Sequence, residues 1–258
     1  MYNIERKSLI VDLLEKNHTV SVSNLAEMLN MSKETVRRDL RELEQEGMIK
    51  RTHGGAVLVP HANNVSESPF AFREIKHYAE KNRICEKAAE YIQDGDTIFV
   101  DNSSTSINLL RYINPSYQVT VVTSSIRLLM EAASLDNHNL TMISLGGIFR
   151  AKNYSLSGVM SLECIKNFRP KLAFLSCHSI RPETGLSDGS IYEVETKRAL
   201  IDSAQTVYIL ADHSKFKENG FVYLSDFSKI ETIITDDQVS SETVRQIENK
   251  GVKVVIVS

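Results

Sequence analysis

Cysteine is scarce in this sequence, and its distribution excludes two kinds of stabilising chemistry. Three cysteines are spread over 258 residues, at Cys85, Cys164 and Cys177. Their number is odd and no two of them form a CxxC pair, so the sequence predicts neither a disulfide framework nor a cysteine zinc site. A chain of this kind is expected in a reducing compartment, and we expect a cytoplasmic protein.

The sequence also lacks net positive charge, long apolar runs and the common enzyme motifs. A formal net charge of −3 excludes a polycation that coats nucleic acid or anionic lipid, so any such binding must come from a local patch. The N-terminal segment MYNIERKSLIVDLLEKN has charges among its apolar residues, which predicts neither a signal peptide nor a membrane span. No P-loop, dinucleotide fingerprint, HExxH or GxSxG motif occurs. We expect no cofactor, no metal and no membrane partner.

What is present begins with three short helical patterns in the first sixty residues. Apolar residues spaced at i, i+3 and i+4 predict a first helix over residues 4–16. Ser21 or Ser23 can cap a second helix. Ser32 can cap a third, which runs to about Glu46. Because a turn of about three residues separates the last two, the pattern predicts a helix-turn-helix.

The third helix and the residues after it place cations on one side. Val36, Leu40 and Leu43 share the core face at about 100° per residue. The opposite face and its flanks carry Lys33, Glu34, Arg37, Arg38, Arg41 and Gln45. Two short strands, 48–51 and 56–59, then form a wing with Lys50 and Arg51 at its base. Residues 1–60 hold nine Lys/Arg and nine Asp/Glu, so the cations are arranged rather than in excess. A solvated charged face is the plain alternative to a DNA-binding surface.

A family resemblance favours DNA. Many spaced positions, from Arg6 through Leu40 to the wing sequence RTHGGA, are similar to DeoR-type bacterial transcription regulators. The resemblance implies that Ser32, Thr35, Arg37 and Arg38 face DNA, that the wing touches phosphates or the minor groove, and that Asp39 is a structural partner for a basic side chain. With the flanking and wing residues, the predicted DNA-binding set is Ser32, Lys33, Thr35, Arg37, Arg38, Arg41, Arg51 and His53.

The rest of the chain predicts a linker followed by an α/β domain. Residues 60–70 are polar and contain two prolines, which predicts a linker between a winged helix-turn-helix domain at 1–59 and a larger domain at 71–258. A long helix is expected over 71–93. Short strands rich in β-branched residues then alternate with helical patterns, such as the one over 106–113. This alternation predicts a parallel sheet covered on both faces.

Polar or glycine-rich stretches follow four of the expected strands, at 101–105, 123–125, 146–147 and 212–216. In open α/β sheets a ligand binds beyond the carboxyl ends of the strands. Hydroxyl groups and backbone N–H groups at the start of a helix can hold an anion, glycine lets the backbone approach a ligand closely, and Lys215 is the cation among these loops.

The C-terminal region also resembles the sensor domain of the DeoR family, whose fold is similar to ribose-phosphate isomerases and glucosamine-phosphate deaminases. The resemblance implies a phosphorylated sugar as effector. The implied contacts are Asp101, Ser103, Ser104, Thr105, Thr123, Ser124, Gly146, Gly147 and Lys215.

We therefore expect a DNA-binding regulator, with operator DNA and a phosphorylated sugar as partners, that represses a sugar-utilisation operon as a homo-oligomer. One alternative is a sugar-phosphate isomerase or deaminase with a DNA-binding head. Its acid or base candidates are Asp101, His178, Glu193, Glu195 and Asp212. Another is a DNA-binding protein whose second domain serves only for assembly.

Overall fold

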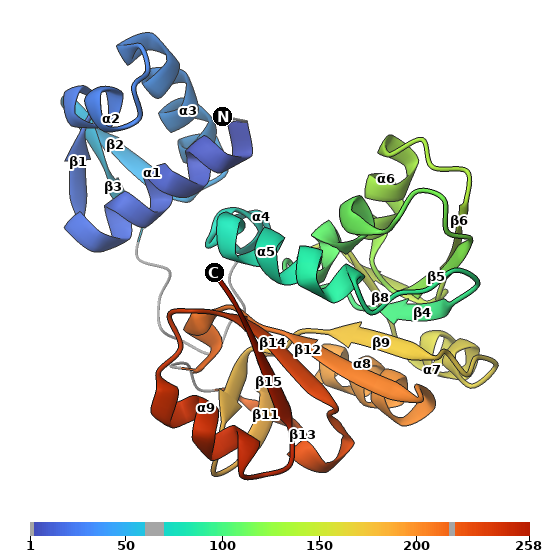
Figure 1. Ribbon diagram of the computed structural model, residues 1–258. Coiled ribbons are helices and arrows are strands. Elements are labelled where there is room, and N and C mark those ends of the chain that lie inside the picture. The colour runs from blue at the N-terminus through green and yellow to red at the C-terminus, as the bar shows by residue number, and fades with distance from the viewer. Residues whose placement is uncertain (1–2, 60–69, 217–219) are drawn as a thin grey trace. The chain divides into compact units, whose positions relative to one another are not determined.

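The computed structural model describes residues 3–59, 70–216 and 220–258, and its chain divides into two compact units, residues 1–79 and 80–258 (Figure 1). The predicted linker falls almost wholly on residues 60–69, outside the described residues. Within the described part of the chain, no helix combines the length and the apolar character that crossing a bilayer requires.

The N-terminal unit is a winged helix-turn-helix with one additional helix. Its helices are α1 (Asn3–Asn17), α2 (Val22–Met28), α3 (Lys33–Gln45) and α4 (Phe70–Ile75). Its strands are β1 (Thr19–Ser21), β2 (Ile49–Thr52) and β3 (Gly55–Leu58), which pair antiparallel in the order β1-β3-β2. The helices α1 to α3 and the two wing strands are as the sequence predicts, while β1 has too few residues to show a strand pattern.

Local signals in the sequence account for these elements. The side chains of Ser21 and Ser32 accept hydrogen bonds from backbone N–H groups in the first turns of α2 and α3, which satisfies donors that a helix start leaves free. Gly55 allows β3 to approach β1 closely, because a Cβ there would lie 2.4 Å from the carbonyl oxygen of Val20. The wing is thereby joined to the sheet.

The long helix expected over 71–93 is wrong, since the chain forms two helices there, α4 and α5 (Tyr78–Ala89). His77, with a φ of 54°, interrupts the helical path between them. Phe72 and Ile75 of α4 pack into the winged-helix core. Ile84 of α5 is also buried, but it belongs to the second unit. The segment thus supplies apolar residues to both units, and the break lets each helix pack in its own unit. The helix α4 belongs to the N-terminal unit, whereas the sequence predicted that the second domain begins at residue 71.

The C-terminal unit is built on a seven-stranded sheet in which every pair of neighbours is parallel. The strands are β4 (Thr97–Val100), β5 (Val119–Thr123), β6 (Leu140–Ser144), β9 (Leu172–Leu175), β12 (Thr206–Leu210), β14 (Thr232–Asp236) and β15 (Lys253–Val257). Their order is β15-β14-β12-β9-β4-β5-β6. They are the runs rich in β-branched residues that predicted a parallel sheet, namely TIFVD, QVTVVT, LTMISL, KLAFLSC, TVYILAD, ETIITD and VKVVIVS. β4, β9 and β12 are buried along almost their whole length, as parallel sheets covered on both faces require.

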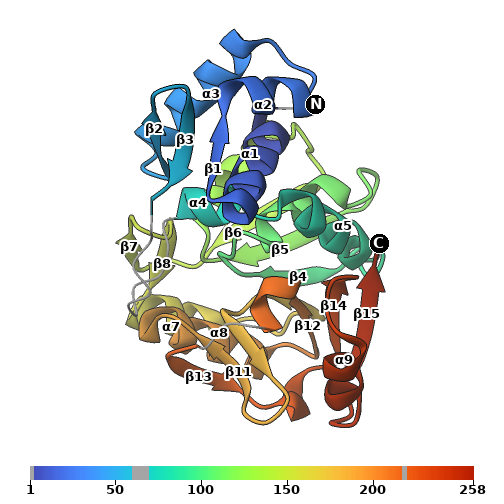
Figure 2. The same cartoon turned by 90° about the vertical axis from the view of Figure 1, so that its left-hand side faces the viewer.

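Helices cover both faces of this sheet, with α5 on one side and α7, α8 and α9 on the other (Figures 1 and 2). The remaining helices are α6 (Ile126–Ser134), α7 (Val159–Ile165), α8 (Ile191–Ser203), α9 (Ser241–Glu248) and the 3₁₀ segments η1 (Ser106–Tyr112), η2 (His213–Phe216) and η3 (Phe227–Lys229). Two small antiparallel sheets, which were not expected, are β7 (Ile148–Arg150) with β8 (Ser155–Ser157), and β10 (Ser179–Arg181) with β11 (Gly185–Asp188) and β13 (Val222–Ser225). The fold class is thus a winged helix-turn-helix plus a parallel-sheet α/β unit.

Candidate DNA-binding surface and effector site

The recognition helix α3 exposes its cations as the sequence predicts. Val36, Leu40 and Leu43 are buried in the winged-helix core, which turns the opposite face to solvent. Lys33, Arg37, Arg38 and Arg41 are exposed there. Ser32 is the N-cap, and Thr35 is half-buried behind it with its backbone N–H bonded to the Ser32 hydroxyl at 3.1 Å. Both residues lie at the helix end that enters the major groove in helix-turn-helix proteins.

These arginines form weak, exposed ion pairs with carboxylates on the same helix. Glu34 lies 3.6 Å from the Arg37 guanidinium and 3.2 Å from that of Arg41, and Glu42 lies 4.0 Å from Arg38. Exposed ion pairs of this kind contribute roughly 0–1 kcal/mol. A phosphate or a base edge can therefore replace the carboxylate at little cost.

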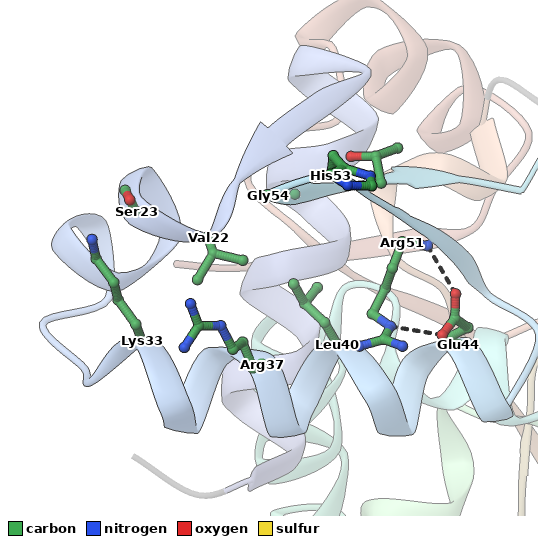
Figure 3. Close-up of a pocket in the computed structure, with 11 residues that line it drawn as sticks. Val22, Ser23, Lys33, Arg37, Leu40, Glu44, Arg51, His53 and Gly54 are labelled. Atoms are coloured by element: carbon green, nitrogen blue, oxygen red, sulfur yellow. Dashed lines mark hydrogen bonds and ion pairs between the residues drawn. The ribbon is translucent and has the colours of Figure 1, made fainter.

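A groove of about 540 Å³ lies between α3 and the wing (Figure 3). Lys33 and Arg37 line it from the helix, and Arg51 and His53 line it from the wing. Arg51 is fixed there: its Nε donates to Glu44 Oε2 at 2.7 Å, and its backbone N–H donates to Glu44 Oε1 at 3.0 Å. These hydrogen bonds lower the pKa of Glu44, the backbone bond being the larger cause. No pattern in the sequence indicates that the wing is tied to the recognition helix.

Asp39 occupies the buried side of α3, where it accepts hydrogen bonds from Nε and Nη2 of Arg6 on α1, the second at 2.8 Å. The hydrogen bond to Asp39 raises the pKa of Arg6 above its ordinary value. This confirms the expectation that Asp39 is a structural partner for a basic side chain rather than a DNA contact.

The predicted effector residues follow strands that are close neighbours in the sheet. Asp101, Ser103, Ser104 and Thr105 come after β4, Thr123 and Ser124 end β5, Gly146 and Gly147 follow β6, and Lys215 lies in η2 after β12. All of these loops leave the carboxyl edge of the sheet, where ligands of open α/β sheets bind. The row from β12 to β6 spans four strand intervals, or about 19 Å at about 4.8 Å per interval. One small ligand therefore reaches only part of the row.

A buried lysine that the sequence did not single out organises the centre of this edge. Lys197 of α8 donates to Asp188 at 2.6 Å and to the backbone oxygen of Ser176 at 2.8 Å, and lies 3.4 Å from Asp101. Burial opposes the charged form of Lys197, but the carboxylates of Asp188 and Asp101 raise its pKa well above the ordinary value. Burial likewise opposes the charged form of Asp188, and Lys197 still leaves the pKa of Asp188 lowered.

Asp101 is occupied by bonds within the protein. Besides Lys197, its carboxylate accepts from the backbone N–H groups of Ser103 at 3.0 Å and Ser176 at 2.9 Å, and from the hydroxyl of Ser106. It is almost fully buried. Its place in the structure is that of an anchor which holds the loop after β4 against the loop after β9.

The hydroxyl loop after β4 differs in detail from the predicted helix start. The expected helix over 106–113 is a 3₁₀ turn, and the Thr105 side chain does not cap it. Ser103 accepts from the backbone N–H of Ser106 at 3.0 Å, so this pair is bonded internally. Ser104 instead receives a hydrogen bond of 3.3 Å from Lys81, a buried lysine of α5 that the sequence reading also missed.

The residues after β5 and β6 are similarly built into the fold. Thr123 accepts from the backbone N–H of Ser125 at 3.0 Å, and the backbone oxygen of Ser124 accepts from Leu156 at 2.8 Å. Gly147, with a φ of 130°, has a packing reason to be glycine, because a Cβ there would lie 2.5 Å from the backbone oxygen of Ser157. Gly146 is exposed, with open space where a Cβ would stand. Of the two glycines, only Gly146 has room for a ligand beside it.

Lys215 is half-buried in η2, which follows β12 and packs against β10. Burial raises the pKa of the nearby Cys177 thiol of the loop after β9 to about 12, Asp188 adds to the rise, and Lys197 and Lys215 oppose it. Cys177 directly follows Ser176, whose backbone binds both Asp101 and Lys197.

Two of the acid and base candidates of the enzyme alternative, Glu193 and Asp212, accept hydrogen bonds from neighbouring side chains or backbone groups. Glu193 is buried and accepts from Arg150 at 2.6 Å, from Ser155 at 2.9 Å and from Asn153 at 3.2 Å. Asp212 accepts from the backbone and side chain of Ser214. Glu193 therefore pairs with Arg150 of β7. Among the described residues, no group of three metal-binding side chains is placed to hold an ion.

Comparison with known proteins identifies both units. Residues 6–61 match the family model of the DeoR-like helix-turn-helix domain, and residues 76–237 match that of the DeoR C terminal sensor domain. The HTH-type transcriptional regulator GolR of Listeria innocua is 32% identical over 99% of both chains. The glycerol-3-phosphate regulon repressor of Escherichia coli is 30% identical over 92% of both chains. The L-fucose operon activator of Haemophilus influenzae is 29% identical over 97% of this chain and 99% of its own.

Solved structures give a looser likeness. Ribose 5-phosphate isomerase A from Methanocaldococcus jannaschii is 16% identical, with a TM-score of 0.39 over 53% of both chains. The translation initiation factor eIF-2B of Pyrococcus horikoshii is 14% identical, with a TM-score of 0.40 over 88% of this chain and 81% of that one. The sequence relatives, by contrast, are named as transcription regulators and extend over nearly the whole chain. The matches of both units and the full-length relatives show that this chain belongs to the DeoR family of DNA-binding transcription regulators.

Proposed function

We propose that this regulator represses a sugar-utilisation operon and that a phosphorylated sugar, bound at the carboxyl edge of the seven-stranded sheet, weakens its hold on operator DNA. The operator is contacted by the N-terminal half of α3 and by the wing. The protein acts in the cytoplasm, where its operator lies.

One observation carries the effector part of the proposal: neighbouring parallel strands end in loops that bring hydroxyl groups and cations to one edge. Asp101, fixed by Lys197, holds the loop after β4 in place. Ser104 and Thr105 follow in that loop, with Lys81 at the Ser104 hydroxyl. A dianionic phosphate matches neutral hydroxyl donors combined with lysine. We place the phosphate at Ser104 and Thr105, with Lys215 as the nearby counter-charge.

The span of the row limits which residues share one ligand. β6 is two strand intervals from β4, or about 10 Å, so Gly146 can meet at most the far end of a sugar whose phosphate lies after β4. Thr123 and Ser124 lie between the two. This assigns the β4 loop to the phosphate, and the β5 and β6 ends to the sugar hydroxyl groups. Lys215 follows β12, which is also two strand intervals from β4, so its long side chain must reach across that distance to act as the counter-charge.

The relatives' names support a metabolic role and both directions of control. One is named a glycerol-3-phosphate regulon repressor and another an L-fucose operon activator. We favour repression because release of DNA by an accumulated substrate phosphate needs only two mutually exclusive states of one chain.

Matched titration calorimetry tests the effector. A panel of sugar phosphates and the corresponding free sugars is titrated into the full chain, with inorganic phosphate as a third arm. We expect a sugar phosphate to bind at least tenfold more tightly than its free sugar and to raise the melting temperature. Binding of the free sugar with equal or higher affinity would overturn the phosphate assignment. Operator affinity that no bound sugar phosphate changes would favour a domain used only for assembly.

A further inference from the structure

The groove between α3 and the wing contains one acidic side chain among its basic ones. Of the residues described around this groove, Glu44 is the acidic one, and Figure 3 shows its carboxylate beside Arg51. The basic residues there are Lys33, Arg37, Arg51 and His53. A carboxylate at the place where DNA phosphates approach opposes binding by repulsion. Its presence in the groove therefore requires another explanation.

Glu44 holds the wing by two hydrogen bonds to a single residue. Its Oε2 accepts from Arg51 Nε at 2.7 Å, and its Oε1 accepts from the backbone N–H of Arg51 at 3.0 Å. The arginine side chain has five N–H donors, and in the described part of the chain neither Nη atom of Arg51 has a bonded partner. The carboxylate thus fixes the direction of the guanidinium and leaves its terminal N–H groups available for a phosphate.

The turn that joins α3 to β2 restricts the wing further. Gly47, with a φ of 73°, donates its N–H to the backbone oxygen of Glu44 at 2.9 Å. The next N–H, that of Met48, donates to the backbone oxygen of Leu43 at 3.0 Å. These are the two hydrogen bonds of a Schellman motif, which ends a helix in a defined turn. Glu44 therefore holds the base of the wing with its backbone and Arg51 with its side chain.

This pair differs from the ion pairs within α3. The arginines of that helix pair with Glu34 and Glu42 at 3.2 to 4.0 Å, and their side chains are 51–60% exposed. The Arg51 side chain is 42% exposed and lies 2.7 Å from a carboxylate of a different element. Arg51 is therefore oriented before DNA binds, to a degree that the helix arginines are not.

We propose that Glu44 is a positioning residue for Arg51 and that it raises the preference of the protein for its operator over other DNA. The inference rests on the proposed contact of the wing with DNA and is independent of the effector. In the operator complex, base contacts select one register, so one phosphate has a constant position and a guanidinium already directed toward it binds well.

On other DNA the same carboxylate has the opposite effect. There the protein is held by charge and moves along the duplex, so the fixed direction of Arg51 contributes little. The negative charge of Glu44 meanwhile lowers the attraction of the groove for phosphates. Glu44 thus favours the operator complex relative to complexes with other sequences.

The test compares the affinities of two DNA probes of equal length for the full chain, by fluorescence anisotropy at about 150 mM salt, because affinities depend on salt. One probe is a duplex that the wild type selects from a random-sequence pool. The other has the same base composition in shuffled order. The quantity of interest is the ratio of the two affinities.

The variants are Glu44→Gln, Arg51→Ala and the double variant Arg51→Ala/Glu44→Gln. Glutamine keeps the size of the side chain and can accept one of the two hydrogen bonds, so we expect the fold to be kept, as circular dichroism will verify. Glu27→Gln is the matched control, because it removes the same charge from an exposed position on α2 of the same unit.

We expect Glu44→Gln to lower the affinity ratio about fivefold, which corresponds to the loss of one exposed ion pair at the upper end of its range. Glu27→Gln should change the ratio less than threefold. In the Arg51→Ala background, Glu44→Gln should also change the ratio less than threefold, because Glu44 acts through Arg51.

A ratio that Glu44→Gln lowers by less than threefold would overturn the inference. So would an equal fall for Glu27→Gln, or a fall of threefold or more that persists without Arg51. Arg51→Ala separates this failure from a failure of the proposed DNA contact. If it leaves both affinities unchanged, the wing does not contact DNA and both proposals are wrong. If it weakens both probes while Glu44→Gln leaves the ratio unchanged, only the role of Glu44 is wrong.

Discussion

Arg6 and Asp39 form a buried ion pair that joins α1 to the recognition helix, with Arg6 Nη2 2.8 Å from Asp39 Oδ1. Their side chains are only 7% and 0% exposed. Because the carboxylate lies on the inner face of α3, the pair fixes the rotation of the helix about its axis. The cations of the outer face are presented to DNA as a consequence.

Removing one partner of this pair should be costly. Arg6→Met leaves the Asp39 carboxylate buried without its counter-charge, which costs about 3–5 kcal/mol. The double variant Arg6→Met/Asp39→Leu should regain most of that loss. Hydrogen exchange of the α1 and α3 amides at increasing urea concentration measures both. Equal destabilisation by the single and double variants would show that the pair acts through packing and not through charge.

Arg38 should contribute to sequence-specific operator binding. Its side chain is 60% exposed and only weakly held by Glu42 at 4.0 Å. If the guanidinium reads one guanine, Arg38→Ala loses about 1–3 kcal/mol of affinity, and the preference at one base position disappears. Gln45→Ala, at the far end of the same exposed face, is the control. Unchanged affinity for Arg38→Ala in a folded protein would contradict the assignment.

The wing arginine should behave differently from Arg38. Arg51→Ala should weaken binding to all sequences alike and reduce the slope of affinity against salt by about 1, as loss of one phosphate contact does. Glu44→Gln removes the carboxylate that neutralises Arg51 and should steepen the same slope. Titrations from 50 to 300 mM salt measure both variants. If Arg51→Ala instead lost affinity only for operators with one particular base, Arg51 would contact a base and not a phosphate.

Much of the fold and part of the site could be predicted from the sequence, for physical reasons that differ by element. The central strands are buried on both faces, so their apolar runs identify them without tertiary information. Ser32 indicates the start of α3, because serine is a preferred N-cap residue. The interrupted helix at His77 could not be predicted, because its two halves pack in different units and the helical periodicity continues through the break.

The buried lysines escaped prediction for a related reason. Lys197 and Lys81 lie in helices, where a lysine is ordinarily solvated, and only the fold brings them to Ser176 and Ser104. Residues after strands are easy to find because strand ends meet at one edge. Side chains such as those of Lys197 and Lys81, which reach this edge from helices, have no neighbouring sequence pattern that would identify them.

His213 and Asp236 predict a pH dependence of stability. His213 Nδ1 lies 3.0 Å from Asp236 Oδ1, and this hydrogen bond raises the pKa of His213. Burial works to raise the pKa of Asp236, yet the bonds from His213 leave it lowered. The histidine contribution is complete below about pH 6.5 and is lost as pH rises through the folded pKa, while the aspartate contribution is complete above about pH 3.9 and is lost on acidification.

The pair should therefore stabilise the fold most between about pH 4 and 6.5. His213→Asn keeps a hydrogen-bond donor and removes the titration. We expect the melting-temperature difference between wild type and His213→Asn to be largest near pH 5.5 and to shrink by pH 8.5. A difference that stays constant over this range would show that His213 acts through packing alone.

The last prediction concerns the coupling of the two units. If an effector lowers operator affinity by some factor, linkage requires operator DNA to lower effector affinity by the same factor. Lys215→Ala should remove the effector response and leave operator binding near normal, because Lys215 belongs to the sheet edge. Arg38→Ala should keep effector binding and lose DNA. Gel-shift assays and calorimetry on both variants give separate readouts. Loss of both activities in a folded Lys215→Ala protein would argue against a separable sensor, and effector release of DNA at the wild-type concentration would remove Lys215 from the phosphate site.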